Sequence, residues 1–96
     1  MIHLEAVVRG GIVPLPIKVY INNIDNDEQV HFTRDGSFKD DYILPTGRYS
    51  VLVGGMNPEG GSTTVTLGGD IKVGPLPKPS FTSGRSMFSA IFYMEI

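Results

Sequence analysis

The sequence predicts a single all-β domain, a sandwich or barrel of about seven to nine short strands. Apolar and polar residues alternate with a period of two along most of the chain, as they do in a strand that has one face on a core. Twelve glycines and seven prolines in 96 residues break these runs at intervals of about ten residues, as turns do in all-β domains. One domain is expected at this length, and we assign residues 1–96 to it.

Five strands are predicted in the first half of the chain, at residues 2–8, 17–21, 29–33, 37–44 and 48–53. Asparagines and aspartates in residues 22–27 favour a turn after the second strand, because their side chains bond to their own backbone. The dipeptide Asp35-Gly36 is typical of a type I′ hairpin turn. We therefore expect the third and fourth strands to pair as a hairpin.

Three further strands are predicted in the second half, at residues 62–67, 71–73 and 86–96. Residues 54–61 are predicted to form a loop, because they hold four glycines and one proline. Three prolines at positions 75, 77 and 79 fix the backbone and remove three hydrogen-bond donors. We therefore expect residues 74–85 to form an extended, proline-rich connection to the final hydrophobic strand.

The final strand, residues 86–96, is apolar on both faces. Seven large apolar residues make it a candidate interface: Met87, Phe88, Ile91, Phe92, Tyr93, Met94 and Ile96. A strand of this kind is either central and covered by the rest of the fold, or covered by a partner or a neighbouring subunit. Both interpretations remain open from the sequence.

Composition and charge exclude several classes of protein. The absence of cysteine excludes disulfide scaffolds, thiolate metal sites and cysteine nucleophiles. A net charge of −2 argues against nucleic-acid binding, and no apolar run is long enough to cross a membrane.

The first residues lack the basic and apolar regions of a signal peptide. We expect synthesis in the cytoplasm, with secretion only if a leader has been removed, and the final location stays unknown.

An acidic turn offers the one candidate metal site. Asp25, Asp27 and Glu28 lie within four residues and supply the oxygen ligands that calcium prefers. Their spacing does not follow the EF-hand pattern, and the alternative is a polar turn kept soluble by its charge. No other cofactor is expected.

Catalysis is not expected. His3 and His31 are the two histidines available as a general base, and each alternates with apolar neighbours on the polar face of a predicted strand. The chain has no Gly-x-Ser-x-Gly elbow. Asp40 and Asp41 would point to opposite faces of a strand, which disfavours a general acid–base pair and favours protection of a sheet edge.

The middle of the chain carries three turn and anchor motifs: PLP at 14–16, FTRDGSF at 32–38 and LPTGRYSV at 44–51. With them, residues 12–67 resemble the carboxypeptidase regulatory-like domains, a transthyretin-like branch of the immunoglobulin-type β-sandwiches. The chain departs from that family at Ile17, where glycine is usual, and in the residues after Leu67, which run longer than the family core. The resemblance implies an immunoglobulin-like sandwich with Phe38 and Tyr49 as core anchors. It also implies a non-catalytic stalk, spacer or contact domain.

These observations favour a non-catalytic structural or interaction module with a protein partner or self-association. It would act within a larger complex, such as a virion decoration, tail or fibre component, or as a surface accessory domain. One alternative is a secreted or cell-surface glycan- or protein-binding module, with Tyr20, Tyr42 or Tyr93 as stacking platforms. A second alternative is a calcium-stabilised adhesion-type domain.

Overall fold

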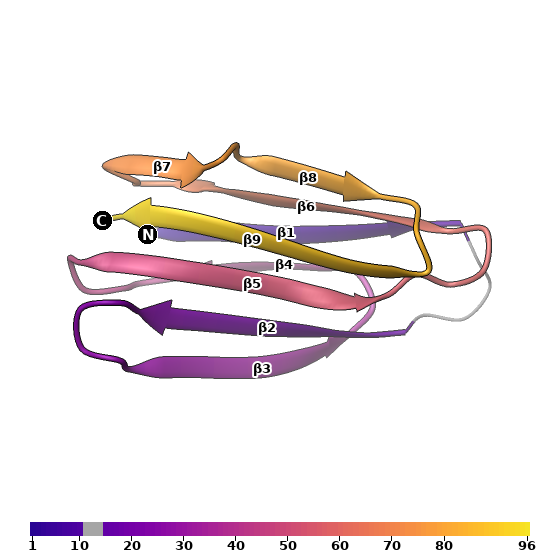
Figure 1. The fold of residues 1–96 in the computed structure, drawn as a ribbon, viewed down its shortest axis with the longest axis horizontal. Helices are drawn as coiled ribbons and strands as arrows, with labels where there is room; N and C mark the ends of the chain where they lie inside the picture. The colour runs from indigo at the N-terminus through magenta and orange to yellow at the C-terminus, as the bar shows by residue number, and fades with distance from the viewer. Residues whose placement is uncertain (11–14) are drawn as a thin grey trace.

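The computed structural model describes residues 1–10 and 15–96, and these residues form nine strands and no helix. The predicted all-β sandwich is therefore confirmed, while residues 12–14 of the family resemblance lie outside the described residues. The strands are β1 (Ile2–Arg9), β2 (Pro16–Asn23), β3 (Gln29–Asp35), β4 (Phe38–Tyr42), β5 (Arg48–Met56), β6 (Ser62–Gly69), β7 (Val73–Leu76), β8 (Ser80–Ser83) and β9 (Met87–Glu95) (Figure 1).

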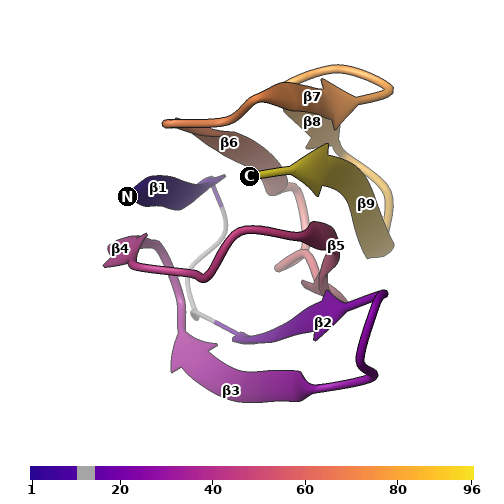
Figure 2. The same cartoon turned by 90° about the vertical axis from the view of Figure 1, so that its left-hand side faces the viewer.

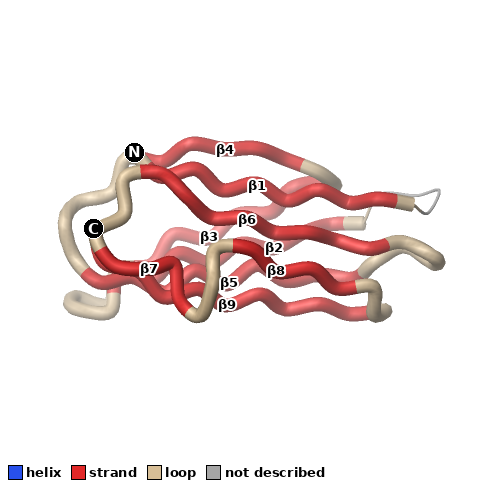
Figure 3. The backbone as a smooth tube through the Cα atoms, turned by 90° about the horizontal axis from the view of Figure 1, so that it is seen from above, coloured by secondary structure: helices blue, strands red, loops and turns tan. Residues whose placement is uncertain are grey.

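The strands form two sheets that pack face to face. One sheet has four strands in the order β4-β1-β6-β8, and the other has five in the order β3-β2-β5-β9-β7. All neighbours within the sheets are antiparallel. Figure 2 views the molecule along its strands, with β1, β4 and β6 on one side and β2, β5 and β9 on the other. Both chain ends lie at the same end of the sandwich (Figure 3).

The turn at Asp35-Gly36 is not a hairpin, which corrects the prediction. β3 is an edge strand of the five-stranded sheet and pairs with β2, whereas β4 belongs to the other sheet and pairs with β1. Gly36 does take the positive φ expected of it, at 106°, a conformation that favours glycine. The residue type therefore predicts the sharp turn correctly, but the turn carries the chain from one sheet to the other.

Two predicted irregular segments contain strands. β5 continues to Met56, because Gly54 and Gly55 pair with β2 on one side and with β9 on the other. Residues 74–85 hold most of β7 and all of β8. Glycine and proline are depleted in β-strands, so the sequence predicts irregular structure at both segments. Pairing with neighbouring strands overrides this low intrinsic preference.

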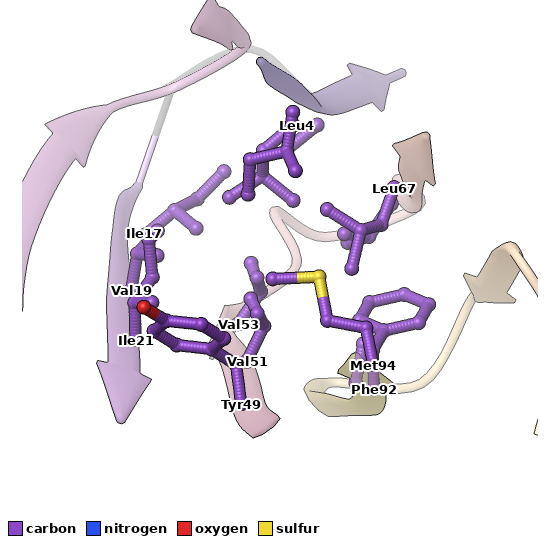
Figure 4. Close-up of a cluster of buried hydrophobic side chains, with 14 of the residues drawn as sticks. Leu4, Ile17, Val19, Ile21, Tyr49, Val51, Val53, Leu67, Phe92 and Met94 are labelled. Atoms are coloured by element: carbon purple, nitrogen blue, oxygen red, sulfur yellow. The ribbon is translucent and has the colours of Figure 1, made fainter. Parts of the chain in front are cut away.

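The core lies between the sheets and is built from the inward positions of alternating strands. Its buried side chains come from five strands: Ile2, Leu4, Ala6, Ile17, Val19, Ile21, Tyr49, Val51, Val53, Val65, Leu67, Phe88, Ala90, Phe92 and Met94. Figure 4 shows part of this cluster, including Leu4, Val51 and Phe92. Full burial of a large apolar side chain contributes about 1.5–3 kcal/mol. The period-two pattern therefore predicts which residues hold the two sheets together.

Tyr49 is buried at the start of β5, and its hydroxyl donates a hydrogen bond of 2.7 Å to the carbonyl oxygen of Pro45. This arrangement matches the tyrosine corner of Greek-key sandwiches, in which a tyrosine hydroxyl bonds to backbone a few residues upstream. Tyr49 thus anchors the core as the resemblance implies. Phe38 is only partly buried and packs against the edge of the core.

Replacing Tyr49 with phenylalanine should lower the free energy of unfolding by about 1 kcal/mol, because the partly buried hydrogen bond to the Pro45 carbonyl is lost. Urea unfolding followed by circular dichroism measures this change. The matched control is Tyr93→Phe on the exposed face of β9, which should change stability by less than about 0.5 kcal/mol. Equal losses in the two variants would contradict a specific role for the tyrosine corner.

Candidate interaction surface

The outer faces of the two sheets differ in chemistry. The four-stranded sheet displays polar pairs: the hydroxyls of Thr64 and Thr82 lie 2.9 Å apart, and His3 Nδ1 lies 2.5 Å from Asp41 Oδ1. The five-stranded sheet is the apolar one. Among residues 1–10 and 15–96, six of the ten exposed large hydrophobic residues lie on β5, β7 and β9, so the exposed apolar surface described by the structure is concentrated on one side of the molecule.

β9 divides the seven predicted interface residues between two environments. Phe88, Phe92 and Met94 are buried in the core, which corrects their assignment to an interface, and Ile96 packs partly buried against that core. The remaining three residues face outward: Met87, Ile91 and Tyr93 are 71%, 47% and 51% exposed. The strand is therefore central in the fold and also displays an apolar face.

A hollow lies beside Gly54 on the outer face. In the register of β5 and β9, Gly54 is paired with Ser89. On the same outer face, the preceding pair is Leu52 and Ile91, and the following pair is Met56 and Met87. Small residues thus sit between larger ones. The resulting cavity has a volume of about 470 Å³ and is lined by Leu15, Pro16, Lys18, Tyr20, Leu52, Gly54, Gly55, Met56, Met87, Phe88 and Ser89.

The apolar surface continues toward β7. Another, smaller hollow of about 170 Å³ is lined mainly by apolar groups, among them Ile24, Val73, Leu76 and Tyr93. At the opposite side of the sheet the ring of Tyr20 stacks on that of His31, with centroids 5.8 Å apart. The face therefore presents apolar and aromatic groups across most of its width.

Three of the four sheet edges, those at β4, β7 and β8, are less suited to association than this face. β4 carries Lys39, Asp40 and Asp41 at the edge of the four-stranded sheet, and β8 at its other edge has four residues. β7 includes Pro75 and pairs irregularly with β9. Charges, proline and short length all discourage edge-to-edge pairing.

The two aspartates of β4 point to opposite faces, as predicted. Asp41 pairs with His3 outside the sheet, whereas Asp40 accepts hydrogen bonds of 3.0 Å from Arg34 Nε and from the Tyr42 hydroxyl. The guanidinium of Arg34 lies 4.4 Å from the centroid of the Phe32 ring. Burial, and then the hydrogen bond to Asp40, raise the pKa of Tyr42 above its ordinary value. This cluster closes the side of the sandwich between β3 and β4.

The acidic turn is organised around an ion pair. Asp25 accepts hydrogen bonds from the Arg48 backbone at 3.1 Å and from its guanidinium at 2.9 and 2.5 Å, and these bonds lower the pKa of the Asp25 carboxyl. Asp27 adopts a left-handed φ of 59°, and the Glu28 backbone N–H donates to Asn26 Oδ1. Across residues 1–10 and 15–96, no three His, Cys, Asp or Glu side chains are grouped to hold a metal ion. Both oxygens of Asp25 bind Arg48, so the calcium site stays a hypothesis.

The histidines lie far from one another in the topology. His3 is on β1 of the four-stranded sheet and His31 on β3 of the five-stranded sheet. His31 contacts Tyr20 and His3 contacts Asp41. The structure therefore does not bring the two candidate bases into one site.

On β5, sequence reasoning did not identify Leu52, Gly54 and Met56 as residues of this surface. The two glycines at 54 and 55 placed this end of β5 in a predicted loop, although Leu52 and Met56 continue the alternation of the strand. This continued alternation with a period of two is the sequence signal that places Leu52, Gly54 and Met56 on one face of the strand.

The chain matches no model of a protein family, no curated protein and no solved structure. The resemblance to the carboxypeptidase regulatory-like domains therefore stays a prediction. In the part of the chain that the structure describes, no helix is long and apolar enough to span a membrane.

Replacing Asp25 with asparagine should make the melting temperature less dependent on pH under acidic conditions. A carboxyl whose pKa is lower in the folded than in the unfolded state contributes stability above the unfolded pKa, and this contribution is lost as pH falls through the folded pKa. The melting temperature of the wild type should therefore fall more steeply than that of Asp25→Asn between about pH 4 and about pH 2. Asp27→Asn in the same turn keeps the ion pair with Arg48 and should retain the wild-type slope. Parallel profiles for wild type and Asp25→Asn would contradict the ion pair.

Proposed function

We propose that this protein is a non-catalytic structural or interaction module that acts through assembly, using the outer face of its five-stranded sheet. The observation that carries the proposal is the row of half-exposed apolar side chains on β9, Met87, Ile91 and Tyr93, beside the hollow at Gly54. Contiguous exposed apolar patches of this kind mark interaction sites in soluble proteins. A component of a larger particle, such as a virion decoration, tail or fibre protein, fits this role.

The energetics favour contact through this face. Removing apolar surface from water contributes about 25 cal/mol per Å², so covering several exposed side chains of β5 and β9 offsets part of the cost of association. The outward side chains are not needed to fill the core, which the opposite face of β9 already supplies. Three protected edges (β4, β7 and β8) and an unprotected apolar face together support association by packing over association by strand addition at those edges.

The alternative functions have less support from the geometry. Of the three tyrosines considered as glycan platforms, Tyr20 is stacked on His31 and Tyr42 is partly buried beside Asp40, which leaves Tyr93. The calcium-dependent alternative would require Asp25 to leave Arg48. The apolar face therefore supports a protein contact better than it supports a sugar or a calcium ion.

Site-specific photo-crosslinking in the cells that naturally make the protein tests this proposal. A photoreactive amino acid replaces Ile91 on the apolar face and, as the matched control, exposed Thr66 on the outer face of the other sheet. We expect protein adducts after irradiation at position 91 and none at position 66. Adducts of equal yield at both positions, or at position 66 alone, would overturn the assignment of the contact to this face.

A further inference from the structure

We propose that the free edge of β3 binds an extended, basic segment of a partner protein as a sixth strand of the five-stranded sheet. The backbone of the partner would pair with β3, and its lysine or arginine side chains would lie beside the carboxylates at the two ends of β3. β3, which the structure describes in full, contributes no residue to the two hollows of the outer face. The inference therefore adds a second contact to the proposed function and does not depend on it.

β3 is the fourth sheet edge, and it is longer or more regular than the other three. Among the described strands it pairs only with β2, over seven residues in continuous register, and Figure 1 shows it as the lowest strand of the sheet. It contains no proline and no lysine, and five of its seven residues are exposed. A regular, exposed edge strand is a template for pairing with another chain.

The hydrogen-bond pattern of the sheet identifies the backbone groups of β3 that face outward. The Asn23 N–H donates a bond of 2.8 Å to the Glu28 carbonyl oxygen, just before β3 begins. The next N–H, that of Ile24, donates instead to the carbonyl oxygen of Arg48 on β5. Successive residues of a strand bond to opposite sides, so every second residue of β3 bonds to β2. The N–H and C=O groups that face away belong to four residues: Gln29, His31, Thr33 and Asp35.

A side-chain contact agrees with this assignment. The Arg34 guanidinium donates a long bond of 3.3 Å to the carbonyl oxygen of Thr33, as expected of a carbonyl that no neighbouring strand uses. The same guanidinium is held on the inner side, where its Nε donates to Asp40 at 3.0 Å and it lies 4.4 Å from the centroid of the Phe32 ring. An added strand would therefore replace one weak bond at Thr33 and leave Arg34 with Asp40.

The inner side of the edge favours apolar side chains in the partner. The Phe32 ring is partly buried, with its centroid 5.6 Å from that of Tyr42. Val30, two residues earlier on the same face, is 54% exposed. The side chains of an added strand alternate between its two faces, so every second one would lie beside Val30 and Phe32. Apolar residues there would remove apolar surface from water and favour binding.

Charge selects a basic partner over a second copy. Asp27 and Glu28 precede β3 and Asp35 ends it, and none of these carboxylates takes part in the ion pairs of residues 1–10 and 15–96. Two copies joined through β3, antiparallel about a two-fold axis at Phe32, would place Asp35 of one beside Glu28 of the other, and like charges at close range repel. Lysine or arginine on both sides of the partner's apolar residues would instead pair with both ends of the edge.

An end-blocked synthetic peptide of sequence KTVTVTVTK tests the inference. It carries valine for the inner side, threonine for the outer side and lysine at both ends. The isotope-labelled full chain is mixed with the peptide at near-millimolar concentration, and amide hydrogen exchange is followed by NMR. We expect slower exchange at the outward amides of β3, those of Gln29, His31, Thr33 and Asp35, and unchanged exchange along β8.

Two matched peptides separate backbone pairing from charge. N-methylation of the fourth and sixth residues keeps every side chain and removes the two donors that would pair with His31 and Thr33. The dissociation constant should then rise at least about tenfold. A peptide with glutamate in place of both lysines should also bind more weakly, and the difference between the two should shrink as salt is added.

Two proline variants test the same edge from the side of the protein. Thr33→Pro removes an outward N–H and no bond to β2, a position at which edge strands tolerate proline, and it should raise the dissociation constant at least about tenfold. Thr82→Pro is the matched control at the edge of β8. Leu67 donates to the Pro79 carbonyl oxygen, so in the register of β6 and β8 the Thr82 N–H also faces away from its neighbour. This variant should bind like the wild type, and circular dichroism confirms that both variants fold.

The outcomes decide between the possible occupants of the edge. Unchanged exchange at near-millimolar peptide, or equal binding by the N-methylated peptide, would overturn the inference. Binding by folded Thr33→Pro that matches the wild type would overturn it as well. If the outward amides of β3 exchange slowly without peptide, and more slowly as the protein concentration rises, a second copy occupies the edge and the basic partner is wrong.

Discussion

The burial of β9 between its neighbours is the constraint on which the rest of the structure depends. Its inward residues Phe88, Phe92 and Met94 are part of the core, as Figure 4 shows for Phe92 and Met94. The strand pairs with β5 along nine residues and with β7 on its other side. Gly47 and Ile96 exchange backbone hydrogen bonds at the end of this strand. Because β9 lies between β5 and β7 in the sheet, the five-stranded sheet is incomplete without it.

A central strand with apolar residues on both faces gives the molecule two different sides. Its inner face closes the core, so its outer face is free to display Met87, Ile91 and Tyr93. The four-stranded sheet has the opposite character, because its outer face pairs hydroxyls and charges. The outer face of the four-stranded sheet is therefore polar. The outer face of the five-stranded sheet retains exposed apolar area that a partner would remove from water.

Local sequence patterns predict the strands and the core well, because alternation reports directly on burial. They fail where a residue type has two structural uses. Asp35-Gly36 predicts a sharp turn and not the sheet that the next strand joins, since sheet membership depends on pairing with distant β1. Gly54 signals a loop in sequence but pairs within β5. For the surface, the sequence identifies β9 as apolar on both faces, but deciding which face is buried requires the position of the other sheet.

Comparing neighbouring substitutions on β9 tests most directly whether this strand has one face for folding and another for contact. The free energies of unfolding of Ile91→Ala and Phe92→Ala are measured at low concentration, where association does not contribute. We expect Phe92→Ala to lose about 3–5 kcal/mol, and Ile91→Ala to lose less than about 1 kcal/mol, because its side chain is half exposed. Comparable losses at both positions would show that the outer face is also required for folding, and would contradict this account.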